Sequence, residues 1–283
     1  MPGFITTNTP LAPLTTIKLG GTARYFADCQ AVDQLREALT FARQKELSVY
    51  VLAGGSNTIF PDDGFNGLVI HVALTGRNFN GETVTVAAGE VWDDLVQEAI
   101  NQDLAGIETM SGVPGSVGAT PMQNVGAYGQ EVSQTITKVE ALDRSTLEKV
   151  TFNNPECEFG YRTSRFKTRD YDKYIITRVT YQLRHNGAPT LAYPQLAEAL
   201  AGGQALKGLA PGREQLQAVR DAVLNIRRRK SMVIDPADPN TRSCGSFFVN
   251  PVLSSQEIKE LANRDKDRAM LPVLRRTLEL KEG

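Results

Sequence analysis

Apolar residues recur every three or four positions in several segments, with charged residues between them. This period places the apolar side chains on one face of a helix, so each of these segments is predicted to be an amphipathic α-helix. In the segment that begins at Trp92, Asp93 and Asp94 fall in the first turn, where negative charge favours the helix dipole. The predicted helices are residues 32–45, 92–100 and 213–230, with a shorter one at 194–201.

Short runs rich in Val, Ile and Thr separate these helices and predict β-strands. The strand–helix–strand order over residues 18–52 predicts two parallel strands joined by a crossover helix. The Thr- and Pro-rich start of the chain is predicted to be a loop. The predicted strands are the end of 18–27, 48–52, 68–73, 83–88, 135–143, 148–152, 173–183 and 245–249.

Two glycine-rich runs interrupt this pattern. One follows the predicted strand 48–52 and is Ala53-Gly-Gly-Ser-Asn57, and the other spans Ser111 to Gly129 with five glycines and two prolines. Glycine permits positive φ and close backbone approach, so both runs predict tight turns whose amides can surround an anion. Together they can hold the pyrophosphate of a dinucleotide from two sides. The alternative is that each is an ordinary tight turn, but the polar side chains Ser56, Asn57, Ser116 and Asn124 favour binding.

Composition limits the partners that the chain can have. The chain has 283 residues and a net charge of −1, from 31 Lys and Arg against 32 Asp and Glu. We expect two or three domains of a cytoplasmic, monomeric protein that binds neither nucleic acid nor membrane, because those partners favour clustered positive charge. The start of the chain lacks a signal peptide pattern, and no run of eighteen apolar residues occurs. Three cysteines, odd in number and far apart without CxxC spacing, argue against a disulfide framework and a zinc site, and we expect no metal site.

Several common catalytic motifs are absent from the sequence. It contains no G-x-x-x-x-G-K-[ST] loop, no G-x-G-x-x-G fingerprint and no G-x-S-x-G elbow. A P-loop NTPase, a Rossmann dehydrogenase and a serine hydrolase are therefore disfavoured. The only two histidines, His71 and His185, have no evident partner, and we interpret them as structural.

The two glycine-rich runs, together with Glu158-Phe-Gly-Tyr-Arg-Thr-Ser164 and Cys244-Gly-Ser-Phe-Phe-Val-Asn-Pro251, closely resemble motifs of the bacterial UDP-N-acetylenolpyruvoylglucosamine reductases. The four motifs stand in the family's order, and the likeness covers residues from about 14 to 254. The resemblance implies an enzyme with FAD and NADPH that reduces UDP-N-acetylglucosamine enolpyruvate to UDP-N-acetylmuramate for peptidoglycan synthesis.

The resemblance also implies an α+β fold. Residues 1–185 would form a two-subdomain FAD-binding module of the vanillyl-alcohol-oxidase type, divided at about residue 67. Residues 186–283 would form a shortened α+β substrate domain, after a hinge at residues 185–189.

Matching the family's motifs residue by residue gives the expected site. Arg162 matches the arginine beside the enolpyruvyl carboxylate, and Ser246 matches the serine that protonates the substrate at C2. Spacing alone favours a turn residue at Ser246 and leaves Arg162 open to being a surface salt-bridge residue. It also explains Arg227 and Lys230 as cations that suit the end of a helix. The expected cofactor-binding residues are Gly54, Gly55, Ser56, Asn57, Gly115, Ser116, Gly118, Ala119, Asn124 and Gly126. The expected substrate-binding residues are Tyr161, Tyr193 (the tyrosine of the family's longer-loop type), Arg227, Lys230 and Asn250.

The likeness ends after Ser254. The family continues there and carries a late catalytic glutamate, whereas Glu257, Glu260, Glu279 and Glu282 match no family motif. The sequence therefore leaves two alternatives open, a reductase and an FAD-binding protein without turnover. We expect weak enolpyruvyl reduction, restored by fusing a full family C-terminal segment after Ser254.

Overall fold

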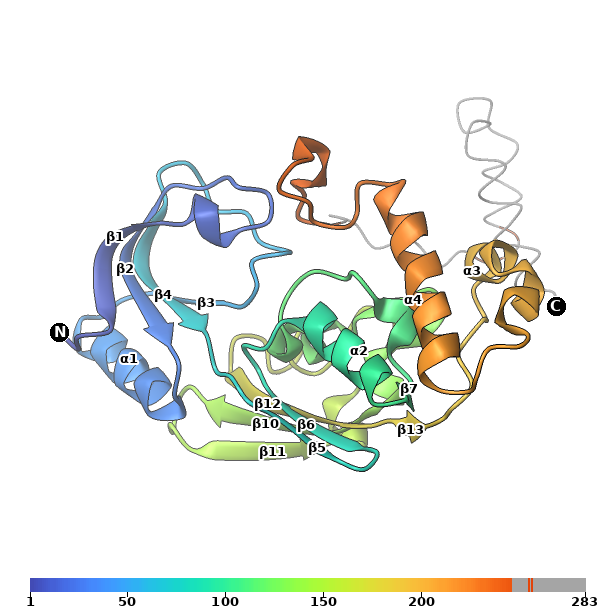
Figure 1. The fold of residues 1–283 in the computed structure, drawn as a ribbon. Helices are drawn as coiled ribbons and strands as arrows, with labels where there is room; N and C mark the ends of the chain where they lie inside the picture. Colours follow the sequence, from blue (N-terminus) through green and yellow to red (C-terminus); the bar gives the residue numbers. More distant parts are fainter. Residues whose placement is uncertain (246–253, 255, 257–283) are drawn as a thin grey trace. The chain divides into compact units, whose positions relative to one another are not determined.

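The computed structural model describes residues 1–245, 254 and 256, and residues 1–245 form one compact unit. Its first part is a four-stranded sheet in the order β1-β2-β4-β3 (Figure 1). β1 pairs antiparallel with β2, while β2 and β3 both pair parallel with β4, which lies between them. The strands are β1 (Ile5–Pro10), β2 (Thr22–Cys29), β3 (Val49–Leu52) and β4 (Phe65–Val72), and α1 (Val32–Gln44) connects β2 to β3.

Two expectations for this region need correction. The start of the chain contains strand β1, although its exposure pattern is almost wholly solvent-facing after Ile5. The strands on either side of α1 are parallel, as predicted, but β4 separates them, so they do not pair directly. The strand that follows the first glycine run thus returns to the centre of the sheet.

The second sheet is five-stranded and antiparallel, in the order β11-β10-β12-β6-β5. Four of its strands were predicted, and β5 was not. The strands are β5 (Arg77–Asn80), β6 (Thr83–Ala87), β10 (Ile136–Asp143), β11 (Lys149–Asn153) and β12 (Tyr174–Gln182). Two short antiparallel pairs complete the strands: β7 (Leu104–Ala105) with β13 (Arg184–His185), and β8 (Gly126–Ala127) with β9 (Gln130–Glu131).

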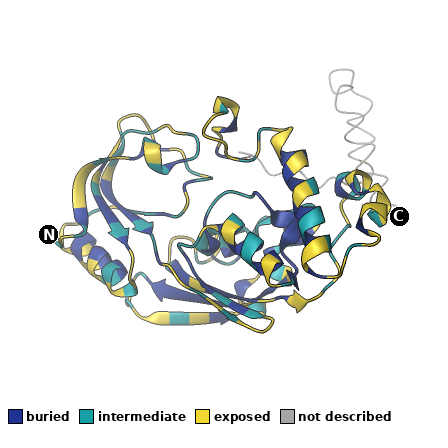
Figure 2. Ribbon diagram, in the orientation of Figure 1, coloured by how far each residue is buried: buried dark blue, intermediate teal, exposed yellow. Residues whose placement is uncertain are grey.

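The predicted helices are present as α1, α2 (Trp92–Asn101), α3 (Pro194–Ala199) and α4 (Arg213–Arg228). Figure 2 shows their two-sided character, with buried residues on one face of α1 and α4 and exposed residues on the other. Short 3₁₀ turns span Ala12–Leu14, Glu108–Met110, Val117–Ala119, Pro121–Gln123, Val132–Gln134, Asn154–Cys157, Ala201–Leu206 and Pro239–Thr241.

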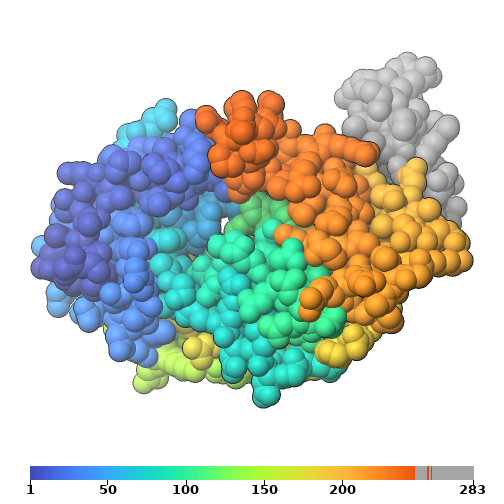
Figure 3. Space-filling view, in the orientation of Figure 1, coloured from blue at the N-terminus to red at the C-terminus, as the bar shows by residue number. Residues whose placement is uncertain are grey.

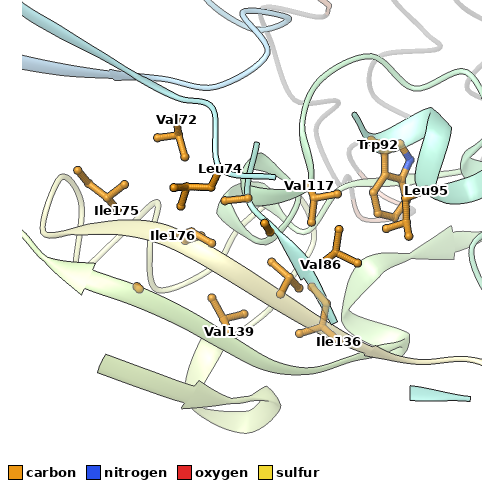
Figure 4. Close-up of a cluster of buried hydrophobic side chains, with 14 of the residues drawn as sticks. Val72, Leu74, Val86, Trp92, Leu95, Val117, Ile136, Val139, Ile175 and Ile176 are labelled. Atoms are coloured by element: carbon orange, nitrogen blue, oxygen red, sulfur yellow. The ribbon is translucent and has the colours of Figure 1, made fainter. Parts of the chain in front are cut away.

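Most of the apolar core lies in one cluster that runs from α1 through the five-stranded sheet to α2. Figure 4 shows part of it, with Val86, Val139 and Ile176 of the sheet near Val117 of the glycine-rich segment. Trp92 is 1% exposed, and its indole N–H donates to the carbonyl of Met110 at 3.1 Å. A separate cluster joins α3, the turn after it and α4.

Candidate functional site

The two glycine-rich turns are in direct contact. A Cβ placed on Gly54 would lie 2.8 Å from the Cα of Gly115, closer than real Cβ atoms come to another atom. The hydroxyl of Ser56 donates to the carbonyl of Pro114 at 3.2 Å. The loop after β3 and the segment 111–129 are 58 residues apart at this bond. The structure thus brings together the two runs that the sequence analysis singled out.

Several backbone amides of the two turns have no hydrogen-bond acceptor in the described part of the chain, and we call them open amides. Within residues 1–245, the amides of residues 54–57 and of Gly115 and Ser116 donate to no protein acceptor. The turn that contains them is anchored to the N-terminal segment, because the carbonyl of Gly55 accepts from the amide of Thr16 at 3.1 Å. Gly55 has φ 63°, and a Cβ there would lie 2.0 Å from the carbonyl oxygen of Leu14. Consecutive open amides of this kind form an anion site.

Ser116 adds a side chain to these donors. Its residue is 6% exposed, and its hydroxyl is buried without a hydrogen-bond partner among the described residues. An unpartnered buried hydroxyl is costly and calls for a physical explanation, and a hydrogen bond to a bound ligand would supply one. The hydroxyl and the open amides together suit the phosphate oxygens of a dinucleotide.

The expected binding amides further along the run are used differently. The amide of Gly118 donates to the carbonyl of Ala88 at 2.8 Å, and that of Ala119 to the carbonyl of Ser116 at 3.0 Å. A Cβ on Gly118 would lie 2.5 Å from the Cβ of Ala88. Gly118 thus packs the glycine-rich run against Ala88, just after β6. Direct contact of Gly118 or Ala119 with a cofactor stays a prediction.

Arg162 lies in a tight two-residue turn. The amides and carbonyls of Gly160 and Thr163 bond to one another at 3.1 and 3.2 Å. Arg162 has φ 55°, and its guanidinium lies 5.8 Å from the ring centre of Tyr161, which is 54% exposed. No carboxylate in the described part of the chain pairs with Arg162, in contrast to the surface salt bridge considered from sequence.

Asn124 and Gly126 make contacts within the protein that hold their own loop in place. The side chain of Asn124, 1% exposed, bonds to Glu131, Ser133 and Gly160. Gly126 pairs with Glu131, and a Cβ on it would lie 2.6 Å from the carbonyl oxygen of Gln130. Their direct contact with a cofactor stays a prediction.

Three of the expected substrate residues, Tyr193, Arg227 and Lys230, lie on or next to α3 and α4. Tyr193 packs edge-on against Tyr128 with ring centres 5.3 Å apart, and Tyr128 lies close enough to Arg227 for the two groups to interact electrostatically. Lys230 donates to Gln195, two residues after Tyr193, at 2.8 Å. The hydroxyl of Thr16 also bonds to the carbonyl of Ser243, so the chain after α4 reaches the N-terminal residues, as Figure 3 shows in orange against blue.

Arg227 is more buried than a solvated helix end predicts. It is 8% exposed, and its Nη2 donates to the carbonyls of Gly112 and Met232 at 3.0 and 2.9 Å. Burial lowers the pKa of Arg227, and its Nε has no partner among the described residues. Its neighbours Arg228 and Arg229 are exposed.

The sequence analysis missed two pairs of interacting side chains. His71 does have a partner, because its Nδ1 lies 2.6 Å from the carboxylate of Asp28 on the neighbouring strand; the expectation that it has none is wrong. Asp93, assigned only to a helix dipole, also bonds to Arg220 and to the amide of Gly112. Neither pair has a signal in local spacing, since the partners of each are more than forty residues apart.

Several other features bear on the site. The expected residues Ser246 and Asn250, and the predicted strand 245–249 beyond Gly245, lie outside the described residues. Two cavities among the described residues, of about 270 and 420 Å³, have linings that include neither Gly54 nor Gly115. Among these residues there is no cluster of His, Cys, Asp and Glu able to hold a metal and no helix long and apolar enough to cross a membrane.

Comparison with known proteins finds a matching domain family and relatives that share one name. The family described as FAD binding domain matches residues 23–146. UDP-N-acetylenolpyruvoylglucosamine reductase from Streptomyces avermitilis is 45% identical over 92% of this chain and 70% of its own length. The enzyme of that name from Thermobifida fusca is 42% identical over 91% of this chain and 72% of its own length.

A solved structure is similar over most of the chain. The crystal structure of UDP-N-acetylenolpyruvylglucosamine reductase from Thermus caldophilus matches with a TM-score of 0.61 and 25% identity, over 90% of this chain and 78% of that one. Together with the matched FAD binding domain, this confirms the expected α+β fold class with an FAD-binding module.

Proposed function

Because this chain belongs to the UDP-N-acetylenolpyruvoylglucosamine reductase family, we propose that it reduces the enolpyruvyl group of UDP-N-acetylglucosamine enolpyruvate with NADPH, through bound FAD. The observation that carries this proposal is the contact of Gly54 with Gly115, flanked by open amides and the buried hydroxyl of Ser116. These donors fit the pyrophosphate of FAD, and they come from two segments that the sequence alone marked as unusual.

FAD, when bound, supplies the transfer of a hydride from NADPH to the substrate. The residues 54–57, Gly115 and Ser116 would hold it by its phosphates. A Cβ on either glycine of the contact would enter the space between the turns. The side chain of Ser56, bonded to Pro114, would keep the two turns at a fixed separation.

Arg162 would hold the carboxylate of the enolpyruvyl group. Its guanidinium has no carboxylate partner among the described residues, so it is available to a ligand. A planar guanidinium can bond a carboxylate at two points and stabilise the negative charge that develops next to it as the enolate forms. Ser246, outside the described residues, would then donate a proton to C2, so the substrate gains one hydride and one proton.

The sugar nucleotide would lie against Tyr193 and Lys230. Both are exposed and adjacent in space through Gln195, and a lysine ammonium suits a phosphate. Direct contact of Arg227 with substrate is a further proposal, and its Nε, unpartnered among the described residues, is the atom that could make it.

We also propose the division of the chain into an FAD-binding part, residues 1–185, and a substrate-binding part after it. The separate apolar cluster of α3 and α4 supports this division.

The test is a turnover assay on the purified chain. We expect a flavin absorbance spectrum with one FAD per chain, and NADPH consumption that depends on UDP-N-acetylglucosamine enolpyruvate. Mass spectrometry should show a product heavier by two hydrogen atoms. Bound FAD without substrate-dependent NADPH consumption would instead support the alternative of a flavin-binding protein without turnover. Absence of bound FAD would contradict both.

A further inference from the structure

Asn124 connects the turn that carries Arg162 to a carboxylate on a different loop. Its Nδ2 donates to the carbonyl of Gly160 at 3.0 Å and to Oε2 of Glu131 at 2.8 Å. Its Oδ1 accepts from the amide of Ser133 at 3.0 Å. One amide side chain thus ties together three backbone segments.

The hydrogen-bonding capacity of this side chain is used for these contacts. A primary amide has two N–H donors, and both are engaged here. Asn124 is 1% exposed and has φ 46°, a left-handed conformation that asparagine tolerates better than most residues. The bond to Glu131 is to a carboxylate, and such bonds are stronger than neutral ones.

The carbonyl of Gly160 that Asn124 holds is part of the Arg162 turn. The same carbonyl accepts from the amide of Thr163 at 3.2 Å, across the two residues Tyr161 and Arg162. Fixing this carbonyl therefore fixes the plane of the peptide from which the turn starts. No other side-chain bond from the segment 111–129 to the backbone of residues 160–163 occurs among the described residues.

We propose that Asn124 is a positioning residue for Arg162: with Glu131, it sets the direction in which the turn presents the guanidinium to the substrate carboxylate. This inference rests on the proposed role of Arg162 and differs from the expectation that Asn124 binds the cofactor. It predicts that loss of the Asn124 side chain affects the enolpyruvyl half of the reaction and spares the NADPH half.

The test uses the FAD-loaded chain and two variants. Asn124→Asp keeps the size and the tolerance for positive φ but turns both donors into an oxygen that repels Glu131 and the Gly160 carbonyl. Asn124→Gly keeps the backbone conformation and removes the side chain, so the measurement does not depend on one variant folding. Asn154→Asp is the matched control, since Asn154 Nδ2 also donates two bonds, to the carbonyls of Ser133 and Ile136, and none to the Arg162 turn.

We expect both Asn124 variants to retain FAD and to be reduced by NADPH at the parent rate in stopped flow. Reoxidation of the reduced flavin by the enolpyruvyl substrate should slow about 10- to 100-fold, the size of effect that a misplacement near 1 Å produces. The control should keep both half-reactions within about twofold, because Asn154 bonds to the carbonyls of Ser133 and Ile136 and makes no bond to residues 160–163. Equal slowing of the NADPH half-reaction, or loss of FAD, would overturn the proposal in favour of a cofactor or purely structural role.

A double-mutant cycle with Arg162→Lys tests whether Asn124 acts through Arg162. If it does, adding Asn124→Asp to Arg162→Lys should slow reoxidation little further, because the shared interaction is already lost. Multiplicative effects would overturn the inference while leaving the role of Arg162 intact. If Arg162→Lys alone changes nothing, the role of Arg162 and the inference both fail.

Discussion

Arg220 of α4 holds Asp93 of α2 by two parallel hydrogen bonds, with Nη1–Oδ1 at 2.6 Å and Nη2–Oδ2 at 2.8 Å. The same Oδ1 accepts from the amide of Gly112 at 2.6 Å. Two turns further along α4, Arg227 donates to the carbonyl of Gly112. Helix α2, through Asp93, holds the amide of Gly112, and helix α4, through Arg227, holds its carbonyl, so the two helices together fix the beginning of the glycine-rich segment.

We expect Asp93→Asn to destabilise the protein. The Arg220 side chain is 9% exposed and that of Asp93 is 32% exposed, so the pair is intermediate between surface and buried. Its loss should lower the free energy of unfolding by about 1–4 kcal/mol, measured by urea denaturation. Asp94→Asn is the matched control, because the Asp94 side chain is 64% exposed and its ion pair with Arg77 is long at 3.8 Å. Equal stability of the two variants would contradict this account.

The same pair predicts a pH dependence. Burial alone would raise the pKa of Asp93, but the hydrogen bonds from Arg220 and from the Gly112 amide outweigh it and hold that pKa below the ordinary 3.8. The carboxylate thus contributes stability that is complete above its unfolded pKa and is lost as pH falls through the lower folded pKa. The difference in unfolding free energy between the parent and Asp93→Asn should narrow only in acid. A difference that already narrows between neutral pH and pH ~5 would show that the folded pKa is not lowered.

Gly54→Ala should weaken FAD binding. The added Cβ would lie 2.8 Å from Gly115 and force the two turns apart, while the φ of Gly54 is one that alanine can adopt. We expect the dissociation constant of FAD to rise at least about tenfold, a change of about 1.4 kcal/mol. Flavin fluorescence titration measures it. Gly3→Ala, where a Cβ meets nothing within 4 Å, should leave FAD affinity unchanged. Unaltered affinity in Gly54→Ala would remove this contact from the cofactor site.

Ser116→Ala should weaken FAD binding without destabilising the flavin-free protein. The hydroxyl is buried without a partner, so its removal should leave the flavin-free protein as stable as the parent or more so. FAD affinity should nevertheless fall about 3- to 10-fold, the equivalent of one hydrogen bond. Ser111→Ala is the contrasting control, because the hydroxyl of Ser111 donates to the backbone carbonyl of Glu108 at 2.6 Å and loss of this bond should destabilise the fold. If Ser116→Ala binds FAD as tightly as the parent, the hydroxyl does not face the cofactor.

Arg162→Lys should slow substrate reduction with little effect on FAD. Lysine keeps the charge but cannot form the two parallel bonds to a carboxylate. We expect kcat/KM for the enolpyruvyl substrate to fall about 10- to 100-fold, equivalent to about 1.4–2.8 kcal/mol. Arg169→Lys is the control, since Arg169 is 56% exposed and pairs with Glu158. Parent-like kinetics in Arg162→Lys would make Arg162 an ordinary surface residue.

The elements with strong local patterns were predictable from sequence. Helices α1, α2 and α4 begin within one residue of their predicted starts, because each buries a single apolar stripe. The glycine runs were recognised because the need for close approach leaves glycine as the permitted residue at Gly54 and Gly55. The family motifs supplied Arg162, which has no periodic signal.

Other features depend on contacts that a local pattern does not carry. Strand β1 shows no alternation, since it is held by pairing with β2 along its length. The place of β4 between β2 and β3 is a matter of topology. Arg227 stands in a basic run that resembles a solvated helix end, and its burial results from the return of residues 111–112 to α4.

Arg162 has a left-handed backbone, a conformation in which glycine or asparagine is less strained than arginine. Selection for folding alone would therefore favour a smaller residue at this position, whereas the proposed reaction requires a guanidinium. A library at residue 162 screened for thermal stability should enrich Gly and Asn, and the same library screened for turnover should return Arg. Resistance to heat and catalysis are thus opposed at a single position of this chain.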